Sequence, residues 1–106
     1  MTEESIFLDH VGDSPRMKVL QYLIEGKDFD YTLTDMLHAQ VSWGTLNQLI
    51  PKLMELGIII KTRKIGRATL YKINPHHETA KQLIVLYQNL LLQRLTDLEH
   101  HTQIPA

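Results

Sequence analysis

The sequence predicts a small, mainly α-helical domain that carries one β-hairpin and ends in a long helix. Three observations support this fold class. Apolar residues recur at helical spacing along much of the chain, residues 58–73 form a β-branched and basic stretch with a glycine turn, and a long apolar-rich helical segment follows. The chain has 106 residues, 43% of them hydrophobic, so it has room for one modest core.

The first long helix is expected to begin at Ser14-Pro15 and to end at Gly26. The serine can cap free backbone N–H groups, and proline fits the first helical position because its missing donor has no partner there. The core-facing residues of this helix are Val19, Leu20, Leu23 and Ile24. Residues 1–13 precede it as an N-terminal arm or helical turn that packs on a core or on a partner through Ile6, Phe7, Leu8 and Val11.

A connector and a short helix come next. Residues 28–32 alternate around two aromatic residues and form either a short strand or an extended connector. The second helix takes Thr34 as its expected cap, and its apolar face consists of Met36 and Leu37. Gln40-Val41 then forms the turn to a third helix.

The third helix is expected to start after a Ser42 cap and to run to Leu56, where Gly57 ends it. Its buried stripe consists of Leu46, Leu49, Ile50, Leu53 and Leu56. Pro51 lies inside this helix and should bend it, because proline removes one backbone hydrogen bond.

A hairpin and a fourth helix complete the chain. Residues 58–63 form the first strand, residues 64–67 form a turn in which Gly66 supplies a positive φ, and residues 69–73 return as the second strand. Asn74-Pro75 repeats the cap-then-proline signal. It opens a helix assigned to residues 76–101, and residues 102–106 are expected to form a flexible tail.

The basic residues are concentrated in one block, although the net charge of the whole chain is −1. Residues 42–73 hold six basic side chains and one acidic side chain, which gives this block a charge of +5. A local positive field attracts a polyanion such as nucleic acid, and an ordinary solvated charged face is the alternative explanation.

The chain resembles the winged helix-turn-helix regulators, the broad group that includes the PadR, ArsR and MarR families, and especially their compact archaeal members. The similarity spans residues 14–75. It is carried by Ser14-Pro-Arg-Met-Lys-Val-Leu, Tyr31-Thr-Leu-Thr-Asp-Met, Val41-Ser-Trp-Gly-Thr-Leu, Leu53-Met-Glu-Leu-Gly-Ile-Ile and Ile65-Gly-Arg-Ala-Thr-Leu-Tyr-Lys-Ile-Asn. One departure is that the usual glycine between helices two and three is absent and the segment His38-Ala39-Gln40 is a residue short.

The resemblance implies a sequence-specific protein that binds double-stranded DNA and regulates transcription. Helix 42–56 would enter the major groove, and the wing, residues 58–73, would touch the backbone or the minor groove. The candidate base-reading residues are Trp43, Gly44, Thr45, Asn47 and Gln48, since amides can pair with adenine and a threonine methyl can contact thymine. The candidate backbone-contacting residues are Arg16, Lys18, Ser42, Lys52, Lys61, Arg63, Lys64 and Arg67.

The fourth helix predicts a homodimer. Its apolar residues form two stripes, and a small domain can cover only part of them. One stripe consists of Leu83, Leu86 and Leu90, and the other, which we expect to form the dimer interface, consists of Ile84, Tyr87, Leu91, Leu95 and Leu98.

Other functional classes have weaker support in the sequence. The chain has no cysteine, no catalytic motif and no His-x-x-x-His spacing, so we expect neither an enzyme, nor a cofactor, nor a metal site. The paired histidines, His76-His77 and His100-His101, leave a metal-sensing site as a minor alternative. No leader-like or membrane-spanning segment is visible, so a cytoplasmic protein with no membrane association is expected. A DNA-organising or plasmid-partition adaptor and a protein-interaction module remain as alternative functions.

Overall fold

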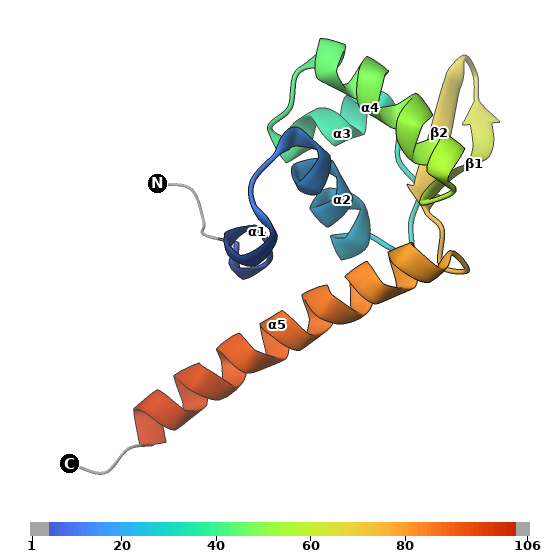
Figure 1. The fold of residues 1–106 in the computed structure, drawn as a ribbon. Helices are drawn as coiled ribbons and strands as arrows, with labels where there is room; N and C mark the ends of the chain where they lie inside the picture. Colours follow the sequence, from blue (N-terminus) through green and yellow to red (C-terminus); the bar gives the residue numbers. More distant parts are fainter. Residues whose placement is uncertain (1–4, 104–106) are drawn as a thin grey trace.

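The computed structural model describes residues 5–103, which form helices and one antiparallel hairpin (Figure 1). The elements are α1 (Ile6–Val11), α2 (Pro15–Glu25), α3 (Leu33–Met36), the 3₁₀ turn η1 (Leu37–Ala39), α4 (Trp43–Leu56), β1 (Ile59–Ile65), β2 (Ala68–Ile73) and α5 (Glu78–Gln103). Figure 1 shows α2, α3, α4 and the hairpin gathered in one body, with α5 running past α1 and α2 and continuing beyond them. The expected class, mainly helical with a hairpin and a long last helix, is confirmed.

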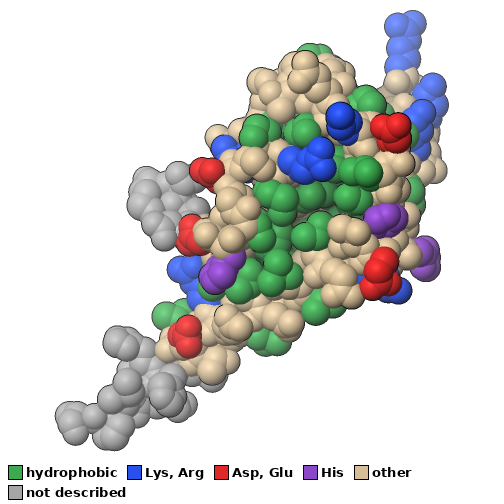
Figure 2. Space-filling view, in the orientation of Figure 1, with side chains coloured by type: hydrophobic (Ala, Val, Ile, Leu, Met, Phe, Trp, Pro, Cys, Tyr) green, Lys and Arg blue, Asp and Glu red, His purple; other side chains and the backbone are tan. Residues whose placement is uncertain are grey.

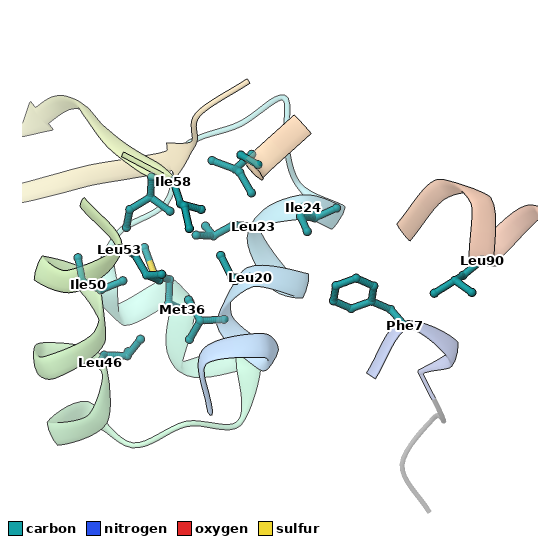
Figure 3. Close-up of a cluster of buried hydrophobic side chains, with 14 residues drawn as sticks. Phe7, Leu20, Leu23, Ile24, Met36, Leu46, Ile50, Leu53, Ile58 and Leu90 are labelled. Carbon is teal, nitrogen blue, oxygen red and sulfur yellow. The ribbon is translucent and has the colours of Figure 1, made fainter. Parts of the chain in front are cut away.

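The core lies between α2, α4 and the base of the hairpin (Figure 3). Each element contributes the apolar side chains that its periodicity places on one face. Nearly or fully buried are Val19, Leu20, Leu23, Ile24, Met36, Leu46, Ile50, Leu53, Ile58, Ile59 and Ile73. Burying one such side chain contributes about 1.5–3 kcal/mol, so these residues supply much of the driving force for folding.

The N-terminal arm is a helix that packs on its own domain. Ser5 caps α1, since its side-chain oxygen accepts a hydrogen bond from the Leu8 N–H at 3.0 Å. Phe7 is fully buried and meets the Tyr87 ring edge-on, with the ring centroids 5.6 Å apart. Figure 3 shows Phe7 between the core side chains of α2 and Leu90 of α5. Residues 1–4, the rest of the expected arm, lie outside the described residues.

The caps of the two main helices are as expected, and the cap of the short helix is not. Ser14 and Ser42 each accept a hydrogen bond from the backbone N–H three residues ahead, at 3.2 and 3.1 Å. The cap of α3 is Thr32 and not Thr34. The Thr32 side chain accepts from the Asp35 N–H at 3.1 Å while the Asp35 carboxylate accepts from the Thr32 N–H at 2.9 Å, and this reciprocal pair starts the helix two residues earlier.

The turn before α4 closes without a glycine. Gln40 adopts φ 68°, the left-handed conformation, at the end of η1. Its N–H donates to the Leu37 carbonyl at 3.1 Å. Glycine adopts this conformation with little strain, whereas a side chain makes it unfavourable. The turn missing its usual glycine is therefore formed by Gln40 in the backbone conformation that glycine favours.

The buried stripe of α4 is narrower than expected. Leu46, Ile50 and Leu53 are buried and Leu49 is half-buried, but Leu56 is 51% exposed. Each residue advances about 100° around an α-helix, which places Leu56 about 120° from Ile50 and off the buried face. The helix continues through Pro51 to Leu56, and Gly57 ends it with φ 85°.

The hairpin is longer and tighter than the sequence indicates. The strands pair up to Ile65 opposite Ala68, so the loop contains only Gly66 and Arg67. Gly66 has φ 62°, which suits the first loop position of a type II′ turn. The register shifts between Lys61 and Arg63, so Thr62 is the extra residue of a β-bulge.

The connector after α2 adds one bridge to this hairpin. The Tyr31 N–H donates to the Tyr71 carbonyl at 2.7 Å, and the Tyr71 N–H donates back to the Tyr31 carbonyl at 2.8 Å. Of the expected connector 28–32, Asp28 and Phe29 belong to a turn closed by the Phe29 N–H, which donates to the Gly26 carbonyl at 2.9 Å, and the residues from Asp30 to Thr32 form the segment that pairs with β2 at one position.

The last helix starts later and runs further than expected. Asn74 does not cap α5, which begins at Glu78. The Asn74 side chain instead accepts from the His76 N–H at 3.0 Å and donates to the Gly57 carbonyl at 2.9 Å, so it holds a turn against the end of α4. The helix reaches Gln103, which overturns the expected tail at residues 102–103, and residues 104–106 lie outside the described residues.

Candidate nucleic-acid interface

The start of α4 presents a capped, solvent-exposed helix end. The Ser42 side chain accepts from the Thr45 N–H at 3.1 Å, and its hydroxyl donates to the Thr45 hydroxyl at 2.8 Å. Trp43 is 51% exposed, and an added Cβ at Gly44 would meet nothing within 4 Å. The first turn of α4 is therefore open to close approach by a large partner.

The outward face of α4 is polar. Gln48 and Lys52 are exposed on the side opposite the buried stripe. Asn47 is also exposed, but its side-chain N–H donates to the Trp43 carbonyl at 3.0 Å. Glu55 lies two turns beyond Gln48 on nearly the same row of the helix and is exposed as well. The negative charge of Glu55 confines the favourable surface for a polyanion to the first three turns.

Two grooves join α4 to the hairpin. One, with a volume of about 250 Å³, is lined by residues that include Thr34 of α3, Trp43 of α4, and Arg67 and Thr69 of the hairpin. The other, about 380 Å³, is lined by residues that include Asn47 and Pro51 of α4, Lys61 of β1 and Tyr71 of β2. The fold thus places the polar start of α4 and the basic hairpin on one continuous surface.

The basic side chains of the hairpin differ in whether they are paired with an acidic residue of the same chain. Lys61, Lys64 and Arg67 are exposed, and Figure 2 shows Lys and Arg side chains gathered at the end of the hairpin. Arg63 is bound within the chain, because its Nε and Nη2 donate to the two Asp30 carboxylate oxygens at 2.9 and 3.1 Å. The hydrogen bonds from Arg63 and Thr62 lower the pKa of Asp30 to about 2, so this carboxylate is ionised at neutral pH.

Arg16 and Lys18, the secondary candidates for backbone contacts, lie elsewhere. Both are half-buried in the first turn of α2, and neither lines the two grooves. The structure therefore brings Trp43, Asn47, Lys61 and Arg67 together around the grooves and leaves these two residues apart. Asp30 is the residue that sequence reasoning missed, because no local pattern links it to a strand 33 residues away.

The apolar stripe of α5 that was expected to form a dimer interface divides into two parts. Ile84 and Tyr87, both expected in a dimer interface, pack against the core of their own chain. Burial and a hydrogen bond to the Glu25 carboxylate at 2.9 Å raise the pKa of Tyr87 to about 12. Further along, Leu91 is 38% exposed and Leu95 is 59% exposed. Leu92 and Leu98 are exposed as well.

A third groove lies where α1, α2 and α5 meet. It has a volume of about 440 Å³ and is lined by Ser5, Ile6, Gln21, Glu25, Tyr87, Leu91 and Arg94. Leu91 lines this groove, and the exposed Leu92, Leu95 and Leu98 follow it, so apolar surface extends from the groove towards the C-terminal end of the helix.

Residues 5–98, whose side chains are described, contain no cluster of three His, Asp or Glu side chains that could hold a metal ion. The side chains of His100 and His101 lie outside the described residues. No helix in the described part of the chain is long and apolar enough to span a bilayer.

Comparisons with protein-family models, curated proteins and solved structures found no match to this chain.

Proposed function

We propose that this chain is a winged helix-turn-helix protein that binds double-stranded DNA and regulates transcription. In this proposal α4 is the recognition helix and the β1–β2 hairpin is the wing. The observation that carries the proposal is the continuous surface formed by the polar start of α4 and the basic hairpin, joined by two grooves.

The order of elements supports this assignment. Helix α2 is followed by a turn and a connector that pairs with β2 at Tyr31, then by α3, a tight turn, α4 and the hairpin. This is the order that the sequence resemblance implies for a winged helix. The left-handed Gln40 closes the turn between the two helices without the usual glycine.

The polar residues of α4 suit the major groove, which admits an α-helix. Gln48 is the strongest candidate for base reading, because its exposed amide has no hydrogen bond among the described side chains and can bind adenine through two hydrogen bonds. Asn47 is a weaker candidate, since its amide already donates to the Trp43 carbonyl. Thr45 is half-buried and tied to the Ser42 cap, which favours a role at the helix end.

The exposed cations of α4 and the hairpin supply the proposed phosphate contacts. Lys52, Lys61, Lys64 and Arg67 are all exposed. Each phosphate neutralised on B-DNA adds about 0.9 to the steepness of the salt dependence, so four such contacts predict a slope of roughly −3 to −4 per subunit.

A second copy of the chain is the proposed partner of α5. Leu91 and Leu95, 38% and 59% exposed, leave apolar surface on the second half of the helix. Two such helices packed across a two-fold axis would cover this surface, and two-fold dimers are the commonest closed oligomers. A dimer would also carry two DNA-binding surfaces.

The salt dependence of duplex binding tests the proposal. Replacing Lys64 and Arg67 by alanine should weaken binding to all sequences and flatten the slope of log K against log salt by about 1.8 per subunit. The matched control is Lys27→Ala with Lys81→Ala, which removes two cations outside the grooves and should leave the slope unchanged. Equal slopes for both double variants would contradict the proposed wing contact.

A Gln48→Ala variant separates regulation at a specific site from general binding. On a duplex selected for tight binding, its loss should be about 1–3 kcal/mol, with relaxed preference at one or two base pairs. A DNA-organising adaptor would instead bind cooperatively along many sites, and its affinity would depend little on Gln48.

A protein-interaction module is a second candidate function. Trp43 and Ile65, 51% and 57% exposed, add apolar area near the same surface. Exposed apolar area of this kind favours a protein partner. Absence of duplex binding at low salt would favour this candidate over the first.

A further inference from the structure

Asp30 holds the middle of the hairpin through its side chain. It lies in the connector between α2 and α3, and its side chain is only 15% exposed. Arg63 donates to both carboxylate oxygens, at 2.9 and 3.1 Å, and the Thr62 hydroxyl donates to one of them. A two-pronged contact between guanidinium and carboxylate fixes direction as well as distance.

The contact falls at the irregular point of the hairpin. Thr62 is the extra residue of the β-bulge, and its hydroxyl also lies 3.3 Å from the Leu70 carbonyl oxygen on the opposite strand. A bulge bends its strand and changes the local twist, so the direction of the outer hairpin depends on how the bulge is held. Asp30 binds the bulge residue and the residue after it.

The neighbouring residue secures the other strand. Tyr31 pairs with Tyr71 of β2 through two backbone hydrogen bonds, 2.7 and 2.8 Å long. The connector is therefore hydrogen-bonded to β2 through the backbone of Tyr31 and to β1 through the side chain of Asp30. Beyond these contacts, from Lys64 to Ala68, the hairpin is exposed.

We propose that Asp30 is a positioning residue that sets the direction of the hairpin relative to α4. The contact of Asp30 with Thr62 and Arg63 is called the clamp below, and Arg63 belongs to this clamp and does not bind a DNA phosphate. The conformational part of the inference rests on the geometry of the clamp alone. Its consequence for DNA rests on the proposed function.

A distance measurement tests the clamp without DNA. The chain has no cysteine, so Glu55→Cys and Lys64→Cys provide two unique sites for spin labels, one on α4 and one on the outer hairpin. Labelled protein diluted with unlabelled protein keeps the measured distance within one chain. We expect one narrow distance distribution with Asp30 present, a distribution at least about twofold broader for Asp30→Ala, and an intermediate one for Asp30→Asn, since an order-disorder change of a segment broadens its distances.

Asp28→Ala is the matched control. Asp28 lies in the same connector, is 80% exposed, and pairs with Lys27 at 3.5 Å and not with the hairpin. Its removal deletes the same charge and should leave the distribution narrow. Circular dichroism confirms that each variant is folded before its distances are compared. A narrow, unshifted distribution in folded Asp30→Ala and Asp30→Asn would overturn the proposal.

Duplex binding supplies the second readout. Loss of the clamp should weaken binding about tenfold, or 1.4 kcal/mol, while the salt slope stays the same because no phosphate contact is lost. Tighter binding with a slope steeper by about 0.9 would show that Asp30 competes with phosphate for Arg63, and would overturn the assignment of Arg63. A broadened distance distribution in a protein that binds no duplex would support the clamp and count against the proposed function.

Discussion

Gln40 shows how one residue can keep a backbone geometry that its side chain disfavours. It closes the turn before α4 at φ 68°, and it is the only described non-glycine residue with a positive φ. The burial of Met36 and Leu46 on either side holds this turn in place. A left-handed conformation in a non-glycine residue makes folding less favourable by about 1–2 kcal/mol, which the surrounding packing offsets.

Replacing Gln40 by glycine should stabilise the protein. We expect a gain of about 0.5–1 kcal/mol in the free energy of unfolding, because the strain is relieved while the unfolded chain gains some freedom. Chemical denaturation measures the change. Asn tolerates the left-handed conformation and should give a smaller gain, whereas Gln40→Val should destabilise the protein. A loss of stability in the glycine variant would contradict the assigned turn geometry.

Asp30 and Arg63 show the opposite case, in which the role of a residue depends on a distant partner. Counted along the sequence, Arg63 is one of six basic side chains in residues 42–73. In the fold its charge is matched by Asp30, so the local positive field is weaker in the middle of the hairpin than at its tip. Lys64 and Arg67 at the tip keep their charges exposed to a partner.

At the scale of elements, the two halves of α5 have different surroundings. Its first half packs on the body through Ala80, Ile84 and Tyr87. Its second half continues past α1, and Leu91 and Leu95 on it are 38% and 59% exposed. One continuous apolar stripe therefore meets its own domain first and solvent afterwards.

Charges placed on the second half of α5 should break the proposed dimer. Leu91→Glu with Leu95→Glu would bury two unpaired carboxylates in the interface, which is costly because buried charges lose their hydration. We expect a folded monomer at micromolar concentration by sedimentation velocity, with DNA affinity lowered about 10²-fold or more through loss of the second binding surface.

Asn89→Glu with Thr96→Glu provides the matched control on the opposite side of the same helix, where both residues are exposed. It adds the same charge and should leave the dimer intact. A wild-type protein that sediments as a monomer, with or without DNA, would refute the dimer. Since Leu91 also lines the groove beside α1, Leu95→Glu alone checks that the effect does not come from disturbed packing there.

At the scale of the whole molecule, the positive block and the exposed leucines of α5 lie on different elements. The positive block lies around α4 and the hairpin, whereas the exposed leucines lie along the far half of α5 (Figures 1 and 2). The molecule is elongated, with extents of 59 × 32 × 23 Å. In the proposed function, one end would bind a polyanion while the far half of α5 would bind a second copy.

A symmetric dimer should prefer two inverted half-sites. If each subunit of the proposed dimer offers α4 as a recognition helix, binding should be strongest when the half-site centres are about one helical turn, roughly 34 Å, or a multiple of it apart. Inserting about 5 base pairs between the half-sites turns one of them to the opposite face and should reduce affinity to that of a single half-site. Titrations on the spaced duplexes measure this. Affinity that does not vary with spacing would argue against two rigidly coupled recognition helices.

The sequence by itself determined the elements whose signals are local. Ser14 and Ser42 predict helix starts, the apolar spacing of α2 and α4 predicts their buried faces, and Gly66 predicts the hairpin turn. Caps, periodicity and turns depend on residues only a few positions apart, so the sequence reveals them directly. The polar start of α4 and the basic block follow from the same local information.

Only the tertiary structure decided which distant residues meet. It packed Phe7 against Tyr87, divided the apolar stripe of α5, and paired Asp30 with Arg63. The structure also starts α5 at Glu78 and not directly after Asn74, because the Asn74 side chain donates a hydrogen bond to the Gly57 carbonyl at the end of α4 instead of capping the helix. These outcomes depend on how faces pack once the chain is compact, and contacts between residues tens of positions apart leave no periodic trace in the sequence.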